Sequence, residues 1–292
     1  MHQLMSFISQ KTMCRFSLLR CASGTEYIGT FMEGGGLGVC NNAGMTDSRS
    51  TTRARRALVT GGSGDIGAAI CAELAAQGSY VYVHANAHRE RAQEVVGAIQ
   101  ASGGQAEAIA FDVTDASATR AALDALLAAG PIDVLVHNAG VHDDAPMAGM
   151  SDAQWHRVID VSLHGFFHVT QPLLLPMGRA RFGRIVCVSS VAAVLGNRGQ
   201  VNYAAAKAAL HGAAKSLARE MASRGITVNV VAPGIIAGRM ADGAFDADQI
   251  KQLVPAARIG MPQEVAALIA FLCSERAGYI NGQVIGVNGG MG

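Results

Sequence analysis

Two residues suited to proton transfer, Tyr203 and Lys207, stand four positions apart in the segment YAAAK. On a helix this spacing places both side chains on one face. A phenol has an ordinary pKa of about 10, too high for easy proton transfer at neutral pH, and a nearby ammonium lowers it. Ser190, at the end of an apolar run upstream, can hold a carbonyl oxygen while the tyrosine protonates it. The three residues predict reduction of a ketone or its reverse, although the pair alone also fits an exposed helix face.

A glycine-rich segment, ALVTGGSGDIG at residues 57–67, predicts a short buried strand, a tight turn and the start of a helix. In this arrangement backbone N–H groups and a helix N-terminus meet a pyrophosphate, and glycine permits the close approach. Gly62, Gly64 and Gly67 also fit the G-x-G-x-x-G spacing of dinucleotide-binding turns. A strand–helix turn without a ligand is the alternative that this segment leaves open.

The elements that must position these residues alternate between strand and helix. Strands are expected at 57–60, 80–84, 106–111, 133–137, 184–189, 227–232 and 283–287. Helices are expected near 65–77, 89–102, 116–129, 152–178, 200–224 and 263–273. The sequence therefore predicts an α/β fold, a single doubly wound parallel sheet of the Rossmann type with helices on both faces. Ligands bind such a sheet beyond the carboxyl ends of its strands, which is where the motifs fall.

The ordered motifs resemble those of the short-chain dehydrogenase/reductase family over roughly residues 54–292. That family carries T-G-x-x-x-G-x-G, N-A-G, a serine and Y-x-x-x-K in this order, which appear here as Thr60–Gly67, Asn138–Gly140, Ser190 and Tyr203–Lys207. The resemblance implies that Ser190 orients the carbonyl and that Tyr203 is the general acid. It also implies that Lys207 lowers the pKa of Tyr203 while it bonds the nicotinamide ribose.

The cofactor form is predicted from the end of the second strand. Sequences that select NAD usually have an acid there, about 20 residues past the glycines, for the ribose 2′-hydroxyl. This chain has no acid at that point, and Arg89 and Arg91 are near enough to meet a 2′-phosphate, so NADPH is predicted. The alternative for the two arginines is an ordinary solvated first turn of a helix. The residues predicted to bind the cofactor are Gly61, Ser63, Gly64, Asp65, Ile66, Gly67, Asn86, Arg89, Asp112, Val113, Asn138, Ala139, Gly140, Tyr203, Lys207, Pro233, Gly234 and Ile236.

Two positions depart from the family pattern. The family often has a catalytic asparagine where this chain has Ser162, whose single hydroxyl replaces an amide with separate donor and acceptor. We include Ser162 among the catalytic residues and expect a slower or rerouted proton relay. Gly238 stands where relatives commonly have a threonine that bonds the nicotinamide amide, which predicts looser clamping of the cofactor.

The segments GNRGQVNYAAAK (196–207) and YINGQVIGVNGGM (279–291) resemble the 3-oxoacyl-[acyl-carrier-protein] reductases of the family. Carrier proteins are acidic, so their docking site needs exposed cations near the pocket mouth. Arg181 and Arg224 match the carrier-docking arginines of that group, although surface arginines near helix ends are also common. The polar residues 238–256 are expected to form a mobile lid over the acyl chain.

The resemblance thus implies hydride delivery from NADPH to the β-keto carbon of a carrier-bound acyl chain, in fatty acid or pigment-type (aryl polyene or xanthomonadin) synthesis. The expected partners are an acyl-carrier protein and further copies of the chain, as a homotetramer. Two alternatives stay open. One is a family member acting on a free alcohol or ketone, and the other is a nucleotide-binding partner subunit with little catalysis.

Composition narrows the remaining classes. Half of the 292 residues are hydrophobic and 15% are charged, which suits a sheet buried on both faces and a large subunit interface. The net charge of +1, without a basic stripe, does not indicate a nucleic acid partner. No apolar run reaches the roughly 20 residues that span a bilayer, so a cytoplasmic protein without a membrane partner is expected. The cysteines lack metal-site spacing, so no metal is predicted, and Cys71, Cys187 and Cys273 are expected to be buried free thiols.

Residues 1–44 do not match the rest of the chain, since they show no sustained helical or strand period. We favour a wrongly assigned start upstream of Met45. A targeting peptide is an alternative, because Lys11, Arg15 and Arg20 precede the first acid, and a genuine regulatory extension is another. In each case the domain expected to carry the reaction is a single unit of residues 45–292.

Overall fold

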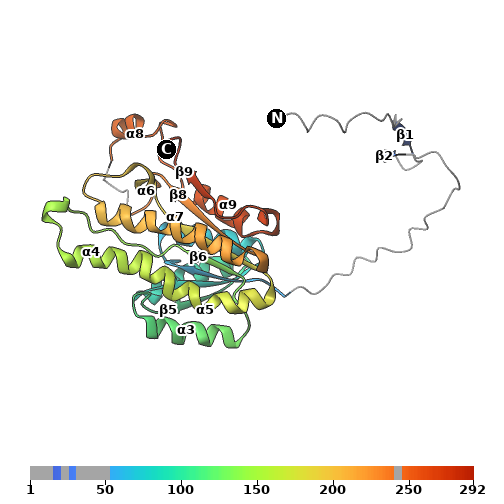
Figure 1. Ribbon diagram of the computed structural model, residues 1–292, viewed down its shortest axis with the longest axis horizontal. Coiled ribbons are helices and arrows are strands. Elements are labelled where there is room, and N and C mark those ends of the chain that lie inside the picture. The colour runs from blue at the N-terminus through green and yellow to red at the C-terminus, as the bar shows by residue number, and fades with distance from the viewer. Residues whose placement is uncertain (1–15, 21–25, 31–52, 240–244) are drawn as a thin grey trace, which may run out of the picture. The chain divides into compact units, whose positions relative to one another are not determined.

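The computed structural model describes residues 16–20, 26–30, 53–239 and 245–292 (Figure 1). Contacts divide the chain into two units, Met1–Thr52 and Arg53–Gly292. In the first unit, β1 (Phe16–Arg20) and β2 (Glu26–Thr30) form an antiparallel hairpin. The sequence analysis expected no strand within residues 1–44 and missed this hairpin, because strands of five residues are too short to show a period. The rest of that segment lies outside the described residues.

The second unit is built on a sheet of seven strands, all paired in parallel, in the order β5-β4-β3-β6-β7-β8-β9. The strands are β3 (Arg56–Thr60), β4 (Tyr80–Ala85), β5 (Gln105–Ala110), β6 (Val134–His137), β7 (Gly183–Val188), β8 (Ile226–Pro233) and β9 (Val284–Val287). The strand order reverses between β3 and β6. In doubly wound sheets the crevice beyond such a reversal is where ligands bind.

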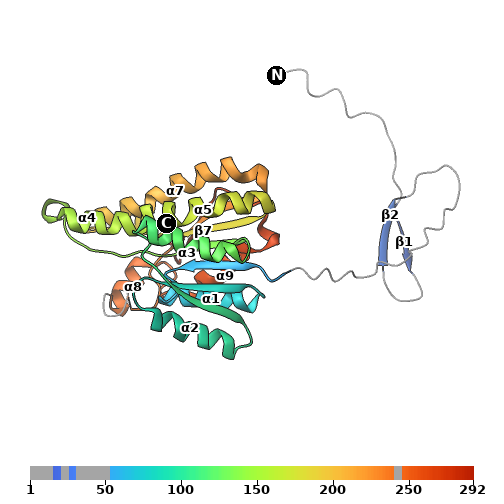
Figure 2. The same ribbon diagram turned by 90° about the horizontal axis from the view of Figure 1, so that it is seen from below.

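Helices cover both faces of this sheet (Figure 2). On one face α1 (Asp65–Ala76), α2 (Arg89–Ala101) and α9 (Pro262–Cys273) pack over one apolar cluster. On the other face α3 (Ala116–Ala128), α5 (Gly165–Ala180) and α7 (Val201–Met221) enclose a second cluster. At the carboxyl ends of the strands lie α4 (Asp152–Ile159), α6 (Ala192–Leu195) and α8 (Ala247–Leu253) (Figure 1).

The single parallel sheet with helices on both faces confirms the predicted fold class, and each predicted strand lies within two residues of an observed one. The long helix expected at 152–178 is interrupted by the π-helix η2 (Asp160–His164) between α4 and α5. A π turn keeps the helix running and leaves its apolar pattern almost unchanged, so periodicity alone does not locate it. Helix α8 lies within the segment expected to form a lid, of which residues 240–244 lie outside the described part.

Cys71, Cys187 and Cys273 are buried free thiols, as predicted, and burial raises the pKa of each. Cys14, Cys21 and Cys40 lie outside the described residues. Among the described residues, no helix combines the length and the hydropathy needed to cross a bilayer. In the same part of the chain, no group of three histidine, cysteine, aspartate or glutamate side chains is arranged to hold a metal ion.

Residues 61–64 form the glycine turn before α1. The packing of α1 against this turn leaves no room for a side chain at Gly67. A Cβ there would overlap the Gly61 carbonyl oxygen and lie 2.9 Å from Nδ2 of Asn138. We expect Gly67→Ala to lower the free energy of unfolding by about 1–3 kcal/mol through overpacking. Gly97→Ala is the matched control, because nothing lies within 4 Å of a Cβ on this exposed residue of α2. It should raise the free energy by about 0.5–1 kcal/mol in urea unfolding, and equal effects of the two substitutions would contradict this packing.

Candidate active site

The structure brings Ser190, Tyr203 and Lys207 together at the carboxyl end of β7. Ser190 follows this strand, and the other two residues lie on the first turns of α7. The hydroxyl of Ser190 is hydrogen-bonded with Tyr203 and accepts the Ala192 N–H at 3.1 Å. Lys207 is buried, its Nζ donates to the Val188 carbonyl at 2.9 Å and lies 5.8 Å from the centre of the Tyr203 ring. The arrangement groups two hydroxyls that can hold and protonate a carbonyl oxygen with a buried ammonium nearby.

Burial dominates the acid–base properties of these residues. It raises the pKa of Tyr203, an effect that the hydrogen bond with Ser190 opposes and the negative charge of Asp144 reinforces. Burial also lowers the pKa of Lys207 to about 8, with Cys187 opposing this shift. The expected lowering of the Tyr203 pKa by Lys207 therefore does not prevail in this structure. Tyr203 is held as the protonated phenol, the form that a general acid needs.

Ser162 lies in the π-helix η2, a type of turn that is frequent at functional sites. It is fully buried, and its hydroxyl has no hydrogen-bond partner among the described residues. A Cβ on Gly140 would lie 3.6 Å from this hydroxyl and 2.7 Å from Nζ of Lys207. The absence of a side chain at Gly140 thus leaves the space in which the ammonium and the free hydroxyl sit near each other.

His137, which the sequence analysis did not single out, links the π turn to the glycine turn. Its Nε2 lies 2.9 Å from the carbonyl of Ser162, and its Nδ1 lies 3.4 Å from the hydroxyl of Thr60. The Thr60 oxygen in turn accepts the N–H groups of Asn138 at 3.1 Å and Ala139 at 3.0 Å. Nε2 therefore carries the proton and Nδ1 accepts, which defines a neutral imidazole. Burial lowers the pKa of His137 to about 3, and the charge of Lys207 adds to this effect.

A second buried histidine, His84, braces the cofactor side of the crevice. Its Nδ1 accepts the Gly61 N–H at 3.1 Å, and its Nε2 donates to the Phe111 carbonyl at 2.8 Å. Burial lowers its pKa to about 4. The residue thus fixes the glycine turn to the end of β5 and is neutral at physiological pH. A polar residue in the otherwise apolar strand YVYVHA was the only signal for it in the sequence.

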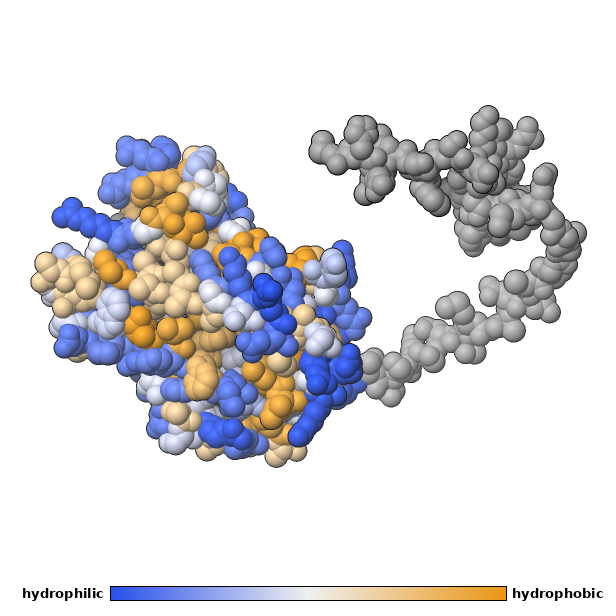
Figure 3. All heavy atoms as spheres, viewed as in Figure 1, coloured by the Kyte–Doolittle hydropathy of each residue, from blue (hydrophilic) through white to orange (hydrophobic). Residues whose placement is uncertain are grey.

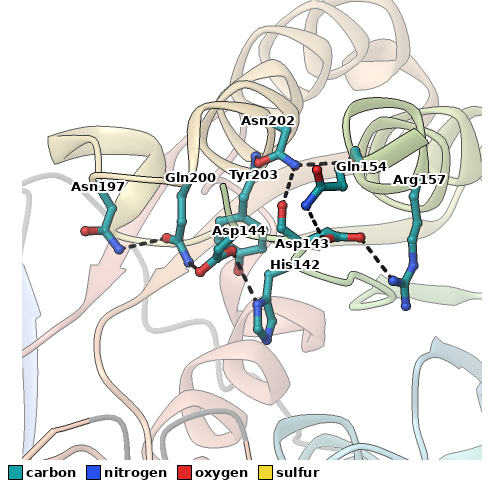
Figure 4. A network of polar contacts seen from close by, with 9 residues as sticks. All are labelled: His142, Asp143, Asp144, Gln154, Arg157, Asn197, Gln200, Asn202 and Tyr203. Carbon is teal, nitrogen blue, oxygen red and sulfur yellow. Dashed lines mark hydrogen bonds and ion pairs between the residues drawn. The ribbon is translucent and has the colours of Figure 1, made fainter. Parts of the chain in front are cut away.

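A polar network at the start of α7 orients Tyr203 (Figure 4). Asn202 is fully buried, its Oδ1 accepts the Tyr203 N–H at 2.8 Å, and its Nδ2 donates to the carbonyls of Asp143 at 2.9 Å and Gln154 at 3.2 Å. This ties the helix start to α4 and to the loop after β6. Asp144, in that loop, accepts from Gln200 at 2.8 Å. The sequence analysis did not anticipate this network.

The glycine turn suits a dinucleotide pyrophosphate. Gly61 has a φ of 62°, and Gly67 packs so closely on Gly61 that no side chain fits, which makes the turn a tight one directly before the N-terminus of α1. The nearby Asn138 donates from Nδ2 to the Gly61 carbonyl at 3.0 Å, which holds the turn against the end of β6. The family pattern T-G-x-x-x-G-x-G places a glycine at position 65, where this chain has Asp65.

The other predicted cofactor residues lie at the same carboxyl edge of the sheet. Asp112 follows β5, where its carboxylate accepts from the N–H and hydroxyl of Thr114, each at 2.8 Å. Val113 is buried against the start of α5. Pro233 ends β8, and Gly234 packs against Asn288, which a Cβ would approach to 2.8 Å. The residues that complete the set are Ser63 and Gly64 in the glycine turn, Ile66 in the first turn of α1 and Ile236 in the loop after β8.

Asn86 and Arg89 lie beyond the end of β4 and are both exposed. Nη2 of Arg89 donates to the Ala108 carbonyl of β5 at 3.3 Å. The guanidinium therefore lies on the edge strand and keeps donors for a second partner.

Arg181 and Arg224 do not lie where a docking site near the chain's own pocket requires them. Arg181 ends α5 just before β7, and Arg224 lies just before β8, so both are at the amino ends of these strands. They lie next to each other, with Nη2 of Arg181 donating to the Ser223 carbonyl at 3.1 Å. Ser190 and Tyr203 are at the opposite edge of the sheet. Their match to the carrier-docking arginines of the family therefore stays a prediction, and the structure places both at the edge of the sheet opposite this chain's own Ser190 and Tyr203.

Comparison with known proteins agrees with this geometry. Residues 62–292 match a family model described as enoyl-(acyl carrier protein) reductase. The chain is 44% identical to the 3-oxoacyl-[acyl-carrier-protein] reductase of Aggregatibacter actinomycetemcomitans over 236 residues, which cover 80% of this chain and 98% of the relative. The chain belongs to the short-chain dehydrogenase/reductase family. Reductases with the same printed name from Staphylococcus aureus (strain Mu50 / ATCC 700699; 44% identity, 81% of this chain, 98% of the relative) and Escherichia coli (strain K12; 43%, 80%, 96%) agree.

Membership of the short-chain dehydrogenase/reductase family makes the chain an oxidoreductase that uses a nicotinamide cofactor. When bound, this cofactor supplies or accepts a hydride. The residues described above fit that role, because a tight glycine turn, the neutral His84 that holds this turn and the buried ammonium of Lys207 all lie at the carboxyl ends of the strands. The protein's own part is to hold the carbonyl oxygen and to move one proton.

The two neutral histidines make stability depend on pH. Unfolded histidine has a pKa of about 6.5. Below that pH the unfolded chain binds protons at His84 and His137 that the folded protein does not bind there. The free energy of unfolding should be fully retained above about pH 6.5 and should fall toward pH 4, by up to about 1.4 kcal/mol per pH unit for each histidine. In urea unfolding at pH 7, 6 and 5, His137→Asn should show a shallower fall than the parent. His88→Asn, at an exposed residue, should keep the parent slope, and a parent slope in His137→Asn would refute this account.

Proposed function

We propose that the protein reduces a 3-oxoacyl thioester, carried by an acyl-carrier protein, to the 3-hydroxyacyl form with NADPH. The observation that carries the proposal is the grouping of Ser190, Tyr203 and Lys207 beyond the carboxyl end of the sheet. The printed names of the most similar relatives support the substrate class. The pathway would be fatty acid synthesis or the synthesis of a pigment-type polyketide.

In this mechanism the three residues have separate roles. The Ser190 hydroxyl holds the carbonyl oxygen, and Tyr203 gives its proton to that oxygen as negative charge develops. The raised pKa of Tyr203 keeps the proton available until the oxygen becomes more basic than the phenolate. The ammonium of Lys207 then stabilises the phenolate left behind. The free hydroxyl of Ser162, near Lys207, offers the next step of a path that returns a proton to Tyr203.

NADPH is proposed as the cofactor form because no acidic side chain follows β4. Asn86 and Arg89 are exposed at that point, and Arg89 keeps donors free. A guanidinium is suited to a 2′-phosphate, because its planar set of N–H donors matches the phosphate oxygens. Arg89 and Arg91 would thus take the place of the acid that selects NAD.

The acyl chain would lie along apolar surface beside α8. Figure 3 shows such surface below α8, in the region of α6. Val194 and Leu195 of α6 are 53% and 56% exposed, and Leu253 at the end of α8 is 48% exposed. Exposed aliphatic groups next to a catalytic hydroxyl favour a hydrocarbon substrate over a sugar. Residues 238–256 are proposed as the lid over this chain.

A homotetramer with the acidic carrier docked between copies is proposed as the working assembly. Phe167 and Leu175 on α5 are 61% and 72% exposed, which leaves an apolar face for a second copy. Helix α5 runs from the catalytic edge of the sheet to Arg181. An antiparallel pairing of two such helices would set Arg181 and Arg224 of one copy beside the catalytic edge of the other. In that way these arginines would serve a neighbour's pocket.

Residues 1–44 are proposed to take no part in the reaction, which we assign to residues 45–292 in the cytoplasm. The family match begins at residue 62, and the first unit divides from the second at Thr52. The hairpin of β1 and β2 lies in the first unit.

The decisive test is NADPH oxidation with an acetoacetyl thioester, comparing the parent with Tyr203→Phe. Loss of the general acid should reduce kcat by about 100- to 10 000-fold, while NADPH still binds. Tyr279→Phe is the control, because this tyrosine is fully exposed and should keep parent activity. A parent that binds NADPH but turns over only free ketones would shift the assignment to that substrate class. Binding without any turnover would indicate a partner subunit.

The departure at Ser162 predicts a second result. We expect Ser162→Asn to raise kcat, since an amide restores a separate donor and acceptor to the proton path. The gain should appear in kcat and in its pH profile and not in KM, because Ser162 is buried beneath the site. A variant that is no faster than the parent across the pH range, while folding normally, would remove Ser162 from the relay.

A further inference from the structure

The loop after β8 contacts the glycine turn through Gly238 and Arg239. Gly238 has a φ of 140°, and a Cβ there would lie 2.6 Å from Oδ2 of Asp65. A side chain at position 238 would therefore occupy the space of the Asp65 carboxylate. The two positions at which this chain departs from the family's glycine and threonine are thus in direct contact. Glycine at position 238 therefore leaves the room that the Asp65 side chain occupies.

The space left by Gly238 lets Asp65 hold Arg239 in place. Oδ2 of Asp65 accepts the backbone N–H of Arg239 at 2.8 Å, and Oδ1 lies 3.3 Å from its Nε. Nη2 of Arg239 also lies 3.5 Å from the carbonyl oxygen of Ser63, inside the glycine turn. The guanidinium, half-exposed, is therefore held over the turn, and Nη1 has no partner among the described residues.

The contact between Asp65 and Arg239 changes the charge next to the N-terminus of α1. Asp65 is the first residue of α1, at the helix end whose N–H groups face an anion. An unpaired carboxylate there would repel a pyrophosphate, since like charges a few ångströms apart interact unfavourably. Arg239 offsets that charge, and its Nη2 lies against the same turn, at the Ser63 carbonyl oxygen. A guanidinium can bond two phosphate oxygens at once.

We propose that Arg239 is a cofactor-binding residue whose guanidinium, positioned by Asp65, bonds the pyrophosphate of the dinucleotide. This would compensate for the missing threonine at position 238. The proposal rests on the nicotinamide site of the proposed function, but not on the substrate or on the choice between NADPH and NADH. It makes Asp65 a positioning residue, since that carboxylate acts only through Arg239.

The first test measures equilibrium dissociation constants of the full chain by fluorescence or calorimetric titration. Two probes are matched: 2′-phospho-ADP-ribose contains the pyrophosphate, and adenosine 2′,5′-bisphosphate lacks it. Arg239→Gln should weaken binding of the first probe and of NADPH by about tenfold, the factor of one charged hydrogen bond. It should change binding of the second by less than about twofold. Arg239→Lys should fall between, and Arg120→Gln, which removes an arginine paired with Asp124 on α3, should match the parent.

The second test uses the sign of the Asp65 effect. In the parent, Asp65→Asn should weaken binding of 2′-phospho-ADP-ribose, because Arg239 loses its anchor. In the Arg239→Gln background the same change should strengthen binding, because it then removes an uncompensated negative charge. A double-mutant cycle measures this reversal directly. A purely structural role for Asp65 would give the same sign in both backgrounds.

The outcomes separate the two levels of inference. If the parent binds none of the probes, the nicotinamide site fails and this proposal falls with it. If the parent binds them and Arg239→Gln binds equally well, only the role of Arg239 is overturned. Equal weakening of both adenine probes would place the guanidinium on a phosphate they share and would also overturn the pyrophosphate assignment.

Discussion

The whole site depends on the close approach of the glycine turn to the end of β6. The Thr60 oxygen accepts two backbone N–H groups there, and Asn138 donates back to the Gly61 carbonyl. These bonds continue the pairing of β3 and β6 past the ends of both strands, at the point where the strand order reverses. Because Gly140 follows directly, the same bonds fix the space around the Lys207 ammonium. The glycine turn and the proton-transfer residues are therefore held in fixed positions relative to each other.

Two neutral histidines extend this link across the crevice. His84 joins the glycine turn to the end of β5, and His137 joins Thr60 to the π turn at Ser162. A neutral imidazole donates one hydrogen bond and accepts another, so it can connect two backbone groups of opposite kind without adding charge. This suits a site whose buried positive charge is Lys207, since a second buried cation would compete for the developing phenolate.

The fold was predictable from the sequence because strands buried on both faces appear as short apolar runs between glycine-rich or polar turns. The grouping of Ser190, Tyr203 and Lys207 followed from motif order, since each motif comes directly after a strand. Contacts between distant residues were not predictable. Arg239 and Asp65 are 174 positions apart, and His137 bonds a carbonyl that only the π turn exposes. The direction of the Tyr203 pKa shift also required the structure, because it depends on how deeply the ring is buried.

The three buried cysteines make local opening of the folded domain measurable by thiol labelling. Thiol reagents and oxidants attack the thiolate, and burial raises the pKa of Cys71, Cys187 and Cys273 so that the folded domain presents almost none. Cys71 and Cys273 lie in α1 and α9, which pack together on one face of the sheet, and Cys187 lies in β7 within the sheet itself. Each can be modified only while its own region is open. The rate at which each thiol is labelled therefore reports how often the structure around that cysteine opens.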